Sequence, residues 1–240
     1  MGVATGDFLQ FLDADDLLGP KKIATQLCAL ENAPPNSVAT SGWSFFTNAN
    51  FEPASPRDFW QSYDDALYLL IDMWRSFGFF PCHSYLLPRT LLADVGYWDE
   101  ALSRDDDGEY FGRVLASANS VVFTADVLAY YRKPSVGHLS CRFSTAASKS
   151  VWRANKMTEK QILSRCSNQR AFEAVFSRWI GLAYQFAGYD KNLMRLAVAR
   201  TEKLPRSARH SAAVGGSLFQ ILSKCIGFRY ALEVRSWLAG

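Results

Sequence analysis

Three carboxylates follow a short apolar run near the start of this sequence, and their type and spacing suit metal or phosphate chemistry. Asp13, Asp15 and Asp16 come directly after the run Phe8–Leu12. Alternate side chains of a strand point the same way, so Asp13 and Asp15 are expected to converge where the backbone leaves a sheet. Carboxylate oxygens are the ligands that Mg²⁺ and Mn²⁺ prefer, and these ions also accept phosphate oxygens from a substrate. The pattern predicts a divalent cation site beside a phosphate site.

Two other interpretations of the three carboxylates stay open at this point. Asp15 or Asp16 could cap a following helix, a position that Asp readily takes, although capping needs only one carboxylate. A phosphatase of the haloacid dehalogenase type also carries two such aspartates after an apolar strand. Asp16 and Leu17 stand where that class has other residue types, which argues against an aspartyl nucleophile.

A second acidic cluster lies further along the chain, after the segment Gly96–Glu100. It holds Asp106, Asp107 and Glu109, at the expected start of a helix. A carboxylate at such a junction can take a proton from a substrate hydroxyl that comes within hydrogen-bond reach. The alternative is an acidic first turn that the helix dipole favours without any catalytic role.

The elements that must position these clusters alternate between strands and helices over the first part of the chain, which predicts an α/β fold. Ligands of open α/β sheets bind at the carboxyl ends of the strands, where the first cluster is expected to lie. Apolar runs bounded by turn residues predict strands at 8–12, 38–40, 84–87, 121–123 and 127–131. Helical spacing and end signals predict helices at 21–31, 58–76, 89–95, 110–118, 146–165, 168–187, 190–203 and 215–238.

Composition and charge divide the chain into two parts. The 240 residues, 49% of them hydrophobic, are enough for one large domain with an appendage. Lys and Arg are outnumbered by Asp and Glu, 11 to 18, in residues 1–150 and outnumber them, 15 to 5, in residues 151–240. Together with the change to purely helical patterns, this asymmetry predicts an α/β domain at 1–145 and a basic helical region at 146–240.

The cysteines and the hydropathy pattern bear on where the protein acts. The five cysteines are odd in number and scattered, without the pairing of a zinc site, which favours a reducing compartment. No apolar stretch is long enough to span a bilayer, and no signal peptide is recognisable. We therefore expect a cytoplasmic protein, and nucleic acid is not an expected partner.

The two acidic clusters, taken in order, resemble those of family 2 glycosyltransferases, whose catalytic domain has the GT-A fold. The resemblance is carried by Phe11–Asp16 (FLDADD), Gly96–Glu100 (GYWDE) and Asp106–Arg113 (DDGEYFGR). Tyr130–Arg132 (YYR) and Gly137–Ser140 (GHLS) fit the closing segment of that domain. The similarity extends over residues 1 to about 142. It implies a partial GT-A mixed sheet with flanking helices, followed by an α-helical region.

The resemblance also implies a reaction and the residues that carry it. The reaction is transfer of a sugar, with inversion, from a nucleotide-diphospho-sugar to a glycan, lipid-linked or other hydroxyl acceptor, as in bacterial polysaccharide biosynthesis. It requires Mn²⁺ or Mg²⁺. Asp13 would contact the donor ribose or a metal-bound water, Asp15 would ligate the metal, and Asp107 would be the general base. The supporting residues would be Asp106 and Glu109 beside the base, and Arg132 and His138 near the diphosphate or metal.

The sequence departs from the family at its beginning. The strands and helices that bind the nucleobase do not precede Phe8, and at about 30 residues per βαβ unit roughly 70 residues are expected to be missing. A truncated chain is therefore predicted, with weak transfer unless another chain supplies that part. The alternative function is a glycosyltransferase remnant that serves as a non-catalytic binding or assembly module.

The last predicted helix, 215–238, combines an apolar face with Lys224, Arg229 and Arg235. A basic amphipathic helix can lie on an anionic membrane surface, where lipid-linked acceptors are found. Packing against its own domain is the other interpretation of the pattern. The membrane interpretation predicts a peripheral protein at the inner face of the membrane.

Overall fold

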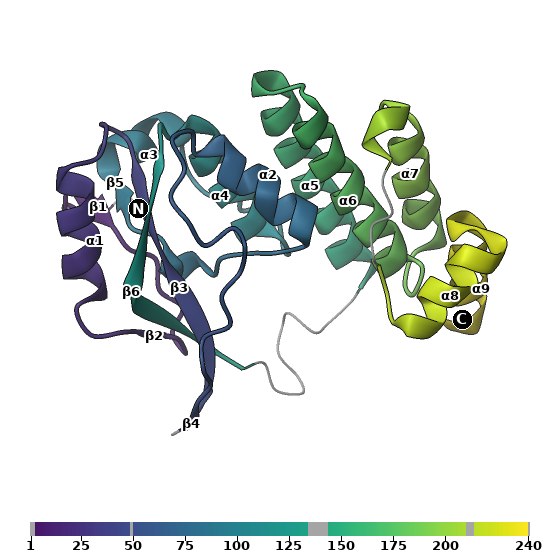
Figure 1. The fold of residues 1–240 in the computed structure, drawn as a ribbon, viewed down its shortest axis with the longest axis horizontal. Helices are drawn as coiled ribbons and strands as arrows, with labels where there is room; N and C mark the ends of the chain where they lie inside the picture. The colour runs from purple at the N-terminus through teal and green to yellow at the C-terminus, as the bar shows by residue number, and fades with distance from the viewer. Residues whose placement is uncertain (1–2, 49, 134–143, 210–213, 240) are drawn as a thin grey trace. The chain divides into compact units, whose positions relative to one another are not determined.

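The computed structural model describes residues 3–48, 50–133, 144–209 and 214–239. It is a mixed α/β structure with a helical carboxyl-terminal region, which confirms the predicted fold class (Figure 1). The described chain forms two compact units. Among the described residues, the first, the sheet unit, comprises 3–48, 50–73, 78–99 and 107–133, and the second, the helical unit, comprises 74–77, 100–106, 144–209 and 214–239. The division at 145 stays a prediction about domains, since these units interleave along the chain.

The sheet unit is built on two long strands that run parallel to each other. β3 (Val38–Thr47) pairs with β6 (Val121–Arg132), and the register shifts between Ser41 and Gly42. β2 (Leu17–Leu18) pairs antiparallel with β6, and β4 (Asn50–Phe51) pairs antiparallel with β3, which gives a four-stranded mixed sheet. Figure 1 shows β3 and β6 side by side through the centre of this unit.

A second, two-stranded pairing places the segment that precedes the first acidic cluster. β1 (Phe8–Leu9) pairs antiparallel with β5 (Leu87–Pro88), and Leu86 bridges to Ala39 of β3. The predicted strand 8–12 is therefore only two residues long, because Gln10–Asp16 leave the pairing. The other helical elements of the unit are α1 (Lys22–Glu31), most of α2 (Leu67–Ser76), the 3-10 helix η1 (Cys82–Ser84), α3 (Arg89–Val95) and most of α4 (Asp106–Ser117).

Several sequence-based expectations for this unit were wrong in extent. The strand expected at 38–40 continues to Thr47, and the two strands expected at 121–123 and 127–131 are the single strand β6. The helix expected over 58–76 begins only at Leu67. Apolar residues such as Phe59, Trp60 and Phe80 pack on one another in irregular backbone instead. The apolar residues before Leu67 are thus packed against other aromatic rings and do not form the face of a helix.

The helical unit follows its sequence signals more closely. Its elements are α5 (Thr145–Arg165), α6 (Gln169–Phe186), α7 (Lys191–Glu202), the 3-10 helix η3 (Arg206–Ala208), α8 (Ser217–Ile226) and α9 (Phe228–Ala239). Side-chain oxygens of Ser144, Asn168 and Asp190 cap α5, α6 and α7 by accepting backbone N–H groups. The single helix expected at 215–238 is broken at Gly227, whose φ of 85° a side chain would not favour.

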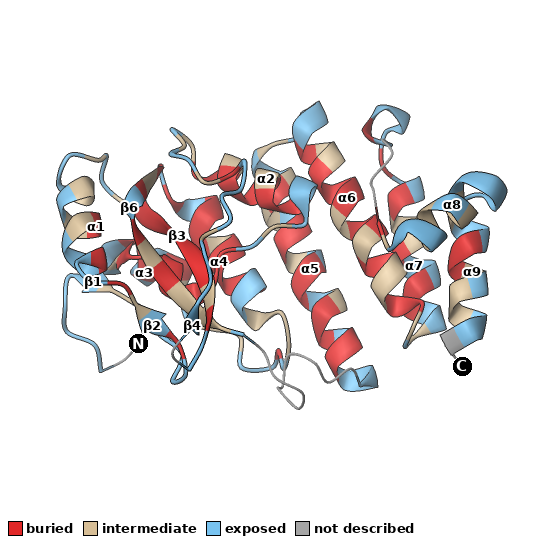
Figure 2. Ribbon diagram, turned by 60° about the horizontal axis from the view of Figure 1, so that its bottom comes forward, coloured by how far each residue is buried: buried red, intermediate tan, exposed pale blue. Residues whose placement is uncertain are grey.

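Burial differs between the helices of this unit. α6 buries a continuous face that includes Trp179, Ala183 and Phe186, whereas α8 buries no residue. Figure 2 shows α6 with red buried positions and α8 in the colours of exposed and intermediate residues. No helix in the described part of the chain is long and apolar enough to cross a membrane.

Candidate active site

The first acidic cluster lies in a turn, not on a strand. The Asp16 N–H donates to the Asp13 carbonyl oxygen at 3.1 Å, which closes a tight turn over Asp13–Asp16. Asp13 and Asp15 are exposed, while Asp16 is buried. The strand expected at 8–12 ends at Leu9, so Asp13 and Asp15 lie beyond the pairing of β1. The turn instead presents two carboxylates to solvent and one to the interior.

Asp16 joins two distant segments and does not cap α1. One carboxylate oxygen, Oδ1, accepts the backbone N–H of Arg132 at 2.7 Å. The other, Oδ2, lies 3.0 Å from Nδ1 of His83, which is fully buried. These two atoms lie within ion-pair distance, and no hydrogen bond joins them. Lys21, at the start of α1, has no side-chain cap, which excludes the capping interpretation of Asp16.

Arg132, at the end of β6, also forms a side-chain hydrogen bond to the backbone of the acidic turn. Its Nε donates to the Asp15 carbonyl oxygen at 2.8 Å, and its guanidinium lies over the ring of Phe46 at 4.5 Å. The structure thus places Arg132 against the backbone of the acidic turn, at the same carboxyl end of β6 that receives Asp16. His138, the other predicted residue of this segment, lies outside the described residues.

Cys82 and His83 of η1 contact the side chains of Asp13 and Asp16, and the sequence analysis predicted neither residue. The Cys82 thiol lies 3.7 Å from Oδ2 of Asp13. Burial raises the pKa of this thiol above its usual range, and the charges of Asp13 and Asp107 raise it further. The only sequence signal was a polar triplet, Cys82–Ser84, inside an apolar stretch. Without knowing the fold, such a triplet indicates only a turn.

Asp107 of the second cluster is brought to the first. It is the second residue of α4 and is exposed, with its Oδ1 accepting the Gly108 N–H at 2.7 Å. The pKa of the Tyr131 phenol is raised by burial and then by the charges of Asp16, Asp107, Asp13 and Asp15. Asp107 therefore acts on the same two side chains, Tyr131 and Cys82, as the acidic turn does.

The other two residues of the second cluster point to different places. Glu109 is buried, and both its oxygens pair with Arg113, at 2.7 Å to Nε and 3.0 Å to Nη2. Arg113 also donates to the carbonyl oxygens of Val95 and Tyr97, so Glu109 anchors the segment that precedes it. Asp106 is half-buried at the first position of α4 and groups with the helical unit.

An aromatic cluster adjoins the acidic turn on the side of α4. Trp98 stacks on Tyr110 with ring centroids 4.1 Å apart, and Phe11 meets Trp98 edge-on at 5.1 Å. Burial raises the pKa of Tyr110 to about 12, against the opposing charge of Arg113. Since Phe11 is two residues from Asp13, this packing joins the GYWDE segment and α4 to the turn.

A buried lysine is linked to the backbone of the Cys82–Ser84 segment through two amide side chains. Nζ of Lys22 donates to Oε1 of Gln10 at 2.9 Å and to Oε1 of Gln26 at 2.7 Å. The two amides in turn donate to the carbonyl oxygens of His83 and Ser84. Because Lys22 is 1% exposed and its hydrogen-bond partners are neutral, burial lowers its pKa to about 7.

The donor groups fit a divalent cation bound together with a phosphate ligand. No group of three or more His, Cys, Asp and Glu side chains within the described residues is arranged to hold a metal alone. Magnesium-type ions bound with a nucleotide need only one or two carboxylates, because water and phosphate oxygens fill the other positions. Exposed Asp13 and Asp15 provide that number of hard oxygen ligands.

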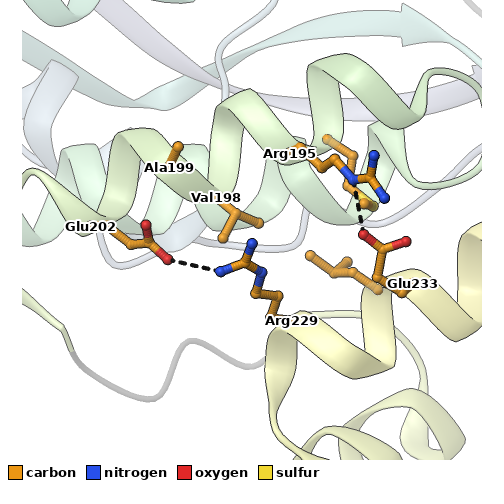
Figure 3. A pocket seen from close by; sticks show the side chains of 8 residues that line it. Arg195, Val198, Ala199, Glu202, Arg229 and Glu233 are labelled. Atoms are coloured by element: carbon orange, nitrogen blue, oxygen red, sulfur yellow. Dashed lines mark hydrogen bonds and ion pairs between the residues drawn. The ribbon is translucent and has the colours of Figure 1, made fainter.

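A pocket in the helical unit has different chemistry. Its space of about 280 Å³, partly open to solvent, lies between α7 and α9. Figure 3 shows Arg195 reaching Glu233 and Arg229 reaching Glu202 across it. The two ion pairs have N–O distances of 3.1 and 3.6 Å. These pairs neutralise its charges, and none of the predicted site residues lines it. The acidic turn is therefore the candidate active site.

No family model and no curated protein matches the chain. Solved structures of S. aureus TarS resemble it. For TarS residues 1–349 in complex with UDP-GlcNAc, the TM-score is 0.66 at 13% identity, covering 99% of this chain and 69% of that one. The same segment without that ligand gives 0.59 at 12%, covering 99% and 68%, and the longer TarS structure gives 0.59 at 12%, covering 98% and 40%. At this identity the likeness shows the fold alone: the chain has a GT-A-like fold similar to that of TarS.

Proposed function

We propose that this chain is an inverting glycosyltransferase domain that transfers a sugar from a nucleotide-diphospho-sugar to a hydroxyl acceptor. One observation carries the proposal. Phe11, two residues before Asp13, packs against Tyr110 and Phe111 of α4, the helix whose first turn carries Asp107. A base for the acceptor and ligands for the donor diphosphate must lie on either side of one sugar, and this packing supports that arrangement.

Asp13 and Asp15 would hold Mn²⁺ or Mg²⁺ with the donor diphosphate, and Arg132 would help to retain the diphosphate. When bound, the ion neutralises charge that develops on the leaving phosphate. The contact between Arg132 and the Asp15 carbonyl keeps the turn in place beside β6. The buried Asp16 carboxylate fixes the turn to β6 by accepting the Arg132 N–H, and the exposed carboxylates of Asp13 and Asp15 would face the ligand.

Asp107 would act as the general base. Its exposed carboxylate can receive the proton of an acceptor hydroxyl, whose oxygen then attacks the anomeric carbon as the bond to the phosphate breaks. A single displacement of this kind inverts the anomeric configuration. Asp106 would support the base as its neighbour in the first turn, and Glu109 would position α4 through its pair with Arg113.

Binding of UDP and UDP-GlcNAc in the presence of Mn²⁺ tests the donor site, and the ligand in the TarS complex motivates the choice of probe. We expect the wild-type chain to bind, Asp15→Ala to bind at least about tenfold more weakly, and Asp126→Ala to bind as the wild type does. Asp126 is an exposed carboxylate of β6 and serves as the matched control. Absence of binding to UDP, GDP and dTDP sugars by the wild type would refute the proposal. Binding without transfer to any acceptor would favour the non-catalytic module.

We further propose that α8 and α9 contact an anionic membrane surface, which would place the protein on the inner face of the membrane, in the cytoplasm. Exposed apolar side chains, among them Leu218 at 83%, Ile221 at 60% and Trp237 at 78%, stand on helices that also expose Lys224 and Arg229. Apolar burial and attraction to anionic lipid together drive such binding. Lipid-linked acceptors would then be accessible.

Sedimentation with lipid vesicles tests the membrane contact. We expect the protein to sediment with phosphatidylglycerol vesicles and much less with phosphatidylcholine vesicles, and we expect Leu218→Ser with Trp237→Ser to abolish sedimentation. Equal recovery of the wild type and this double variant in the pellet would contradict the contact.

A further inference from the structure

The three residues before α4, Ser103 to Asp105, belong to the helical unit and are bound by side chains of α5 and α6. Oγ of Ser150, on α5, accepts the backbone N–H groups of Ser103 at 2.9 Å and Arg104 at 3.1 Å. The same hydroxyl donates to the Arg104 carbonyl oxygen at 2.8 Å. One buried side chain of α5 therefore binds three backbone groups of Ser103 and Arg104, directly before Asp105.

Asp105, the next residue, is held by its side chain. Its Oδ2 accepts Nη2 of Arg178 at 2.9 Å and also accepts Nδ2 of Asn155. Nε of Arg178 donates to Oδ1 of Asn155, which is 1% exposed. Asp105, Asn155 and Arg178 thus form a closed triad in which each member contacts the other two. All three belong to the helical unit.

The backbone of Asp105 is in the left-handed region, with φ at 60°. That conformation costs a residue with a side chain on the order of 1 kcal/mol, although Asp tolerates it better than most. It persists only where surrounding contacts determine it. Here the triad and Ser150 supply those contacts, and the result is a fixed turn from which α4 starts at Asp106.

We propose that this triad is a positioning device for Asp107, the second residue of α4. This inference rests on the proposed function, because it gives the triad a role in presenting the general base. Asp105 lies two residues before Asp107, so its backbone conformation sets the direction in which the first turn of α4, which carries Asp107, leaves the Asp105 turn. Misplacing a catalytic group by about 1 Å can cost about 100-fold in rate.

Kinetics of three variants test the inference. We expect Asp105→Ala to lower kcat about tenfold to 100-fold with the KM for the donor changed less than about twofold. Asp105→Asn should keep most of the activity, since Asn tolerates φ near 60° and its side-chain oxygen can accept from Arg178. Arg195→Gln removes another ion pair of the same unit, that with Glu233, and should leave kcat unchanged.

A double-variant cycle separates positioning from general loss of structure. If Asp105 acts through Asp107, adding Asp105→Ala to Asp107→Asn should lower the residual rate no further. Multiplicative losses, or equal losses of kcat and donor affinity in Asp105→Ala, would refute the inference.

Hydrogen exchange provides a readout that does not depend on activity. Amides 110–113, the first that can donate to carbonyl oxygens of α4 itself, should exchange at least about tenfold faster in Asp105→Ala than in the wild type or Arg195→Gln, with amides in β3 unchanged. Unchanged exchange at 110–113 would overturn the inference. A wild type that transfers no sugar would instead refute the proposed function, and hydrogen exchange would still decide whether the triad orders this turn.

Discussion

Nδ1 of His83 lies 3.0 Å from Oδ2 of Asp16, and both side chains are buried beneath the acidic turn. The contact joins η1 to the turn, and the second oxygen of Asp16 joins the turn to β6 through the Arg132 N–H. Three segments, the outer two of them 116 residues apart in sequence, therefore meet at one carboxylate. The exposed Asp13 and Asp15 are held by this buried residue.

Asp16→Ala should destabilise the protein by about 1–3 kcal/mol, because it removes the acceptor of the Arg132 N–H. Urea unfolding monitored by tryptophan fluorescence measures the change. Asp64→Ala, which removes an exposed carboxylate, should change the free energy of unfolding by less than about 0.5 kcal/mol. Equal effects of the two substitutions would show that the contacts of Asp16 contribute nothing specific.

Asp107→Asn should lower the rate of sugar transfer by about 100-fold or more while UDP binding stays within about twofold, because the amide cannot accept the hydroxyl proton. Steady-state kinetics and UDP titration of the same preparations measure both quantities. Asp126→Asn serves as the control on β6. Loss of UDP affinity in Asp107→Asn, with kcat retained, would assign Asp107 to donor binding.

Lys22 should make stability depend on pH. Its pKa in the folded protein is about 7, below its ordinary value of 10.5, so between these values the unfolded chain holds a proton that the native protein lacks. The free energy of unfolding should therefore rise with pH above 7, by at most about 1.4 kcal/mol per unit. Below pH 7 Lys22 is protonated in both the folded and the unfolded chain, so it adds no pH dependence.

Unfolding of the wild type and Lys22→Met at pH 6 to 9 measures this dependence. The difference in free energy of unfolding between them should grow in favour of the wild type from pH 7 to 9. Lys21→Met, at the exposed neighbouring position, should show the slope of the wild type. A difference between the wild type and Lys22→Met that is flat across this range would refute the prediction.

Gly19→Ala should destabilise the sheet unit by about 1–3 kcal/mol, because the added Cβ would overlap the carbonyl oxygen of Leu128 on β6. The Gly19 N–H donates to that same oxygen at 2.9 Å, so the two backbones cannot separate without losing the bond. Thermal unfolding measures the loss. Gly188→Ala, whose Cβ would meet only ordinary contacts, is the comparison; an equal shift in Tm for both would contradict the steric argument.

Local signals in the sequence were enough to locate most of the helices and the carboxylates of interest. The helices expected at 146–165, 168–187 and 190–203 begin within one residue of their predicted starts, because a helix start depends on residues within one turn, here the caps Ser144, Asn168 and Asp190. The carboxylates Asp13, Asp15 and Asp16, and Asp106, Asp107 and Glu109, likewise stood out by type and spacing alone. Their proposed roles stay predictions.

What joins those residues was decided by tertiary structure. The functions of Asp16, Cys82 and His83 in holding the turn, and of Asn155 and Arg178 in holding Asp105, arise from contacts between segments far apart in the chain. Spacing along the sequence reports periodicity and end signals, but it carries no record of which side chain will meet another across the fold. The sequence by itself thus determined the helical pattern and the acidic clusters, and packing decided which carboxylates are buried to support the site and which are left exposed.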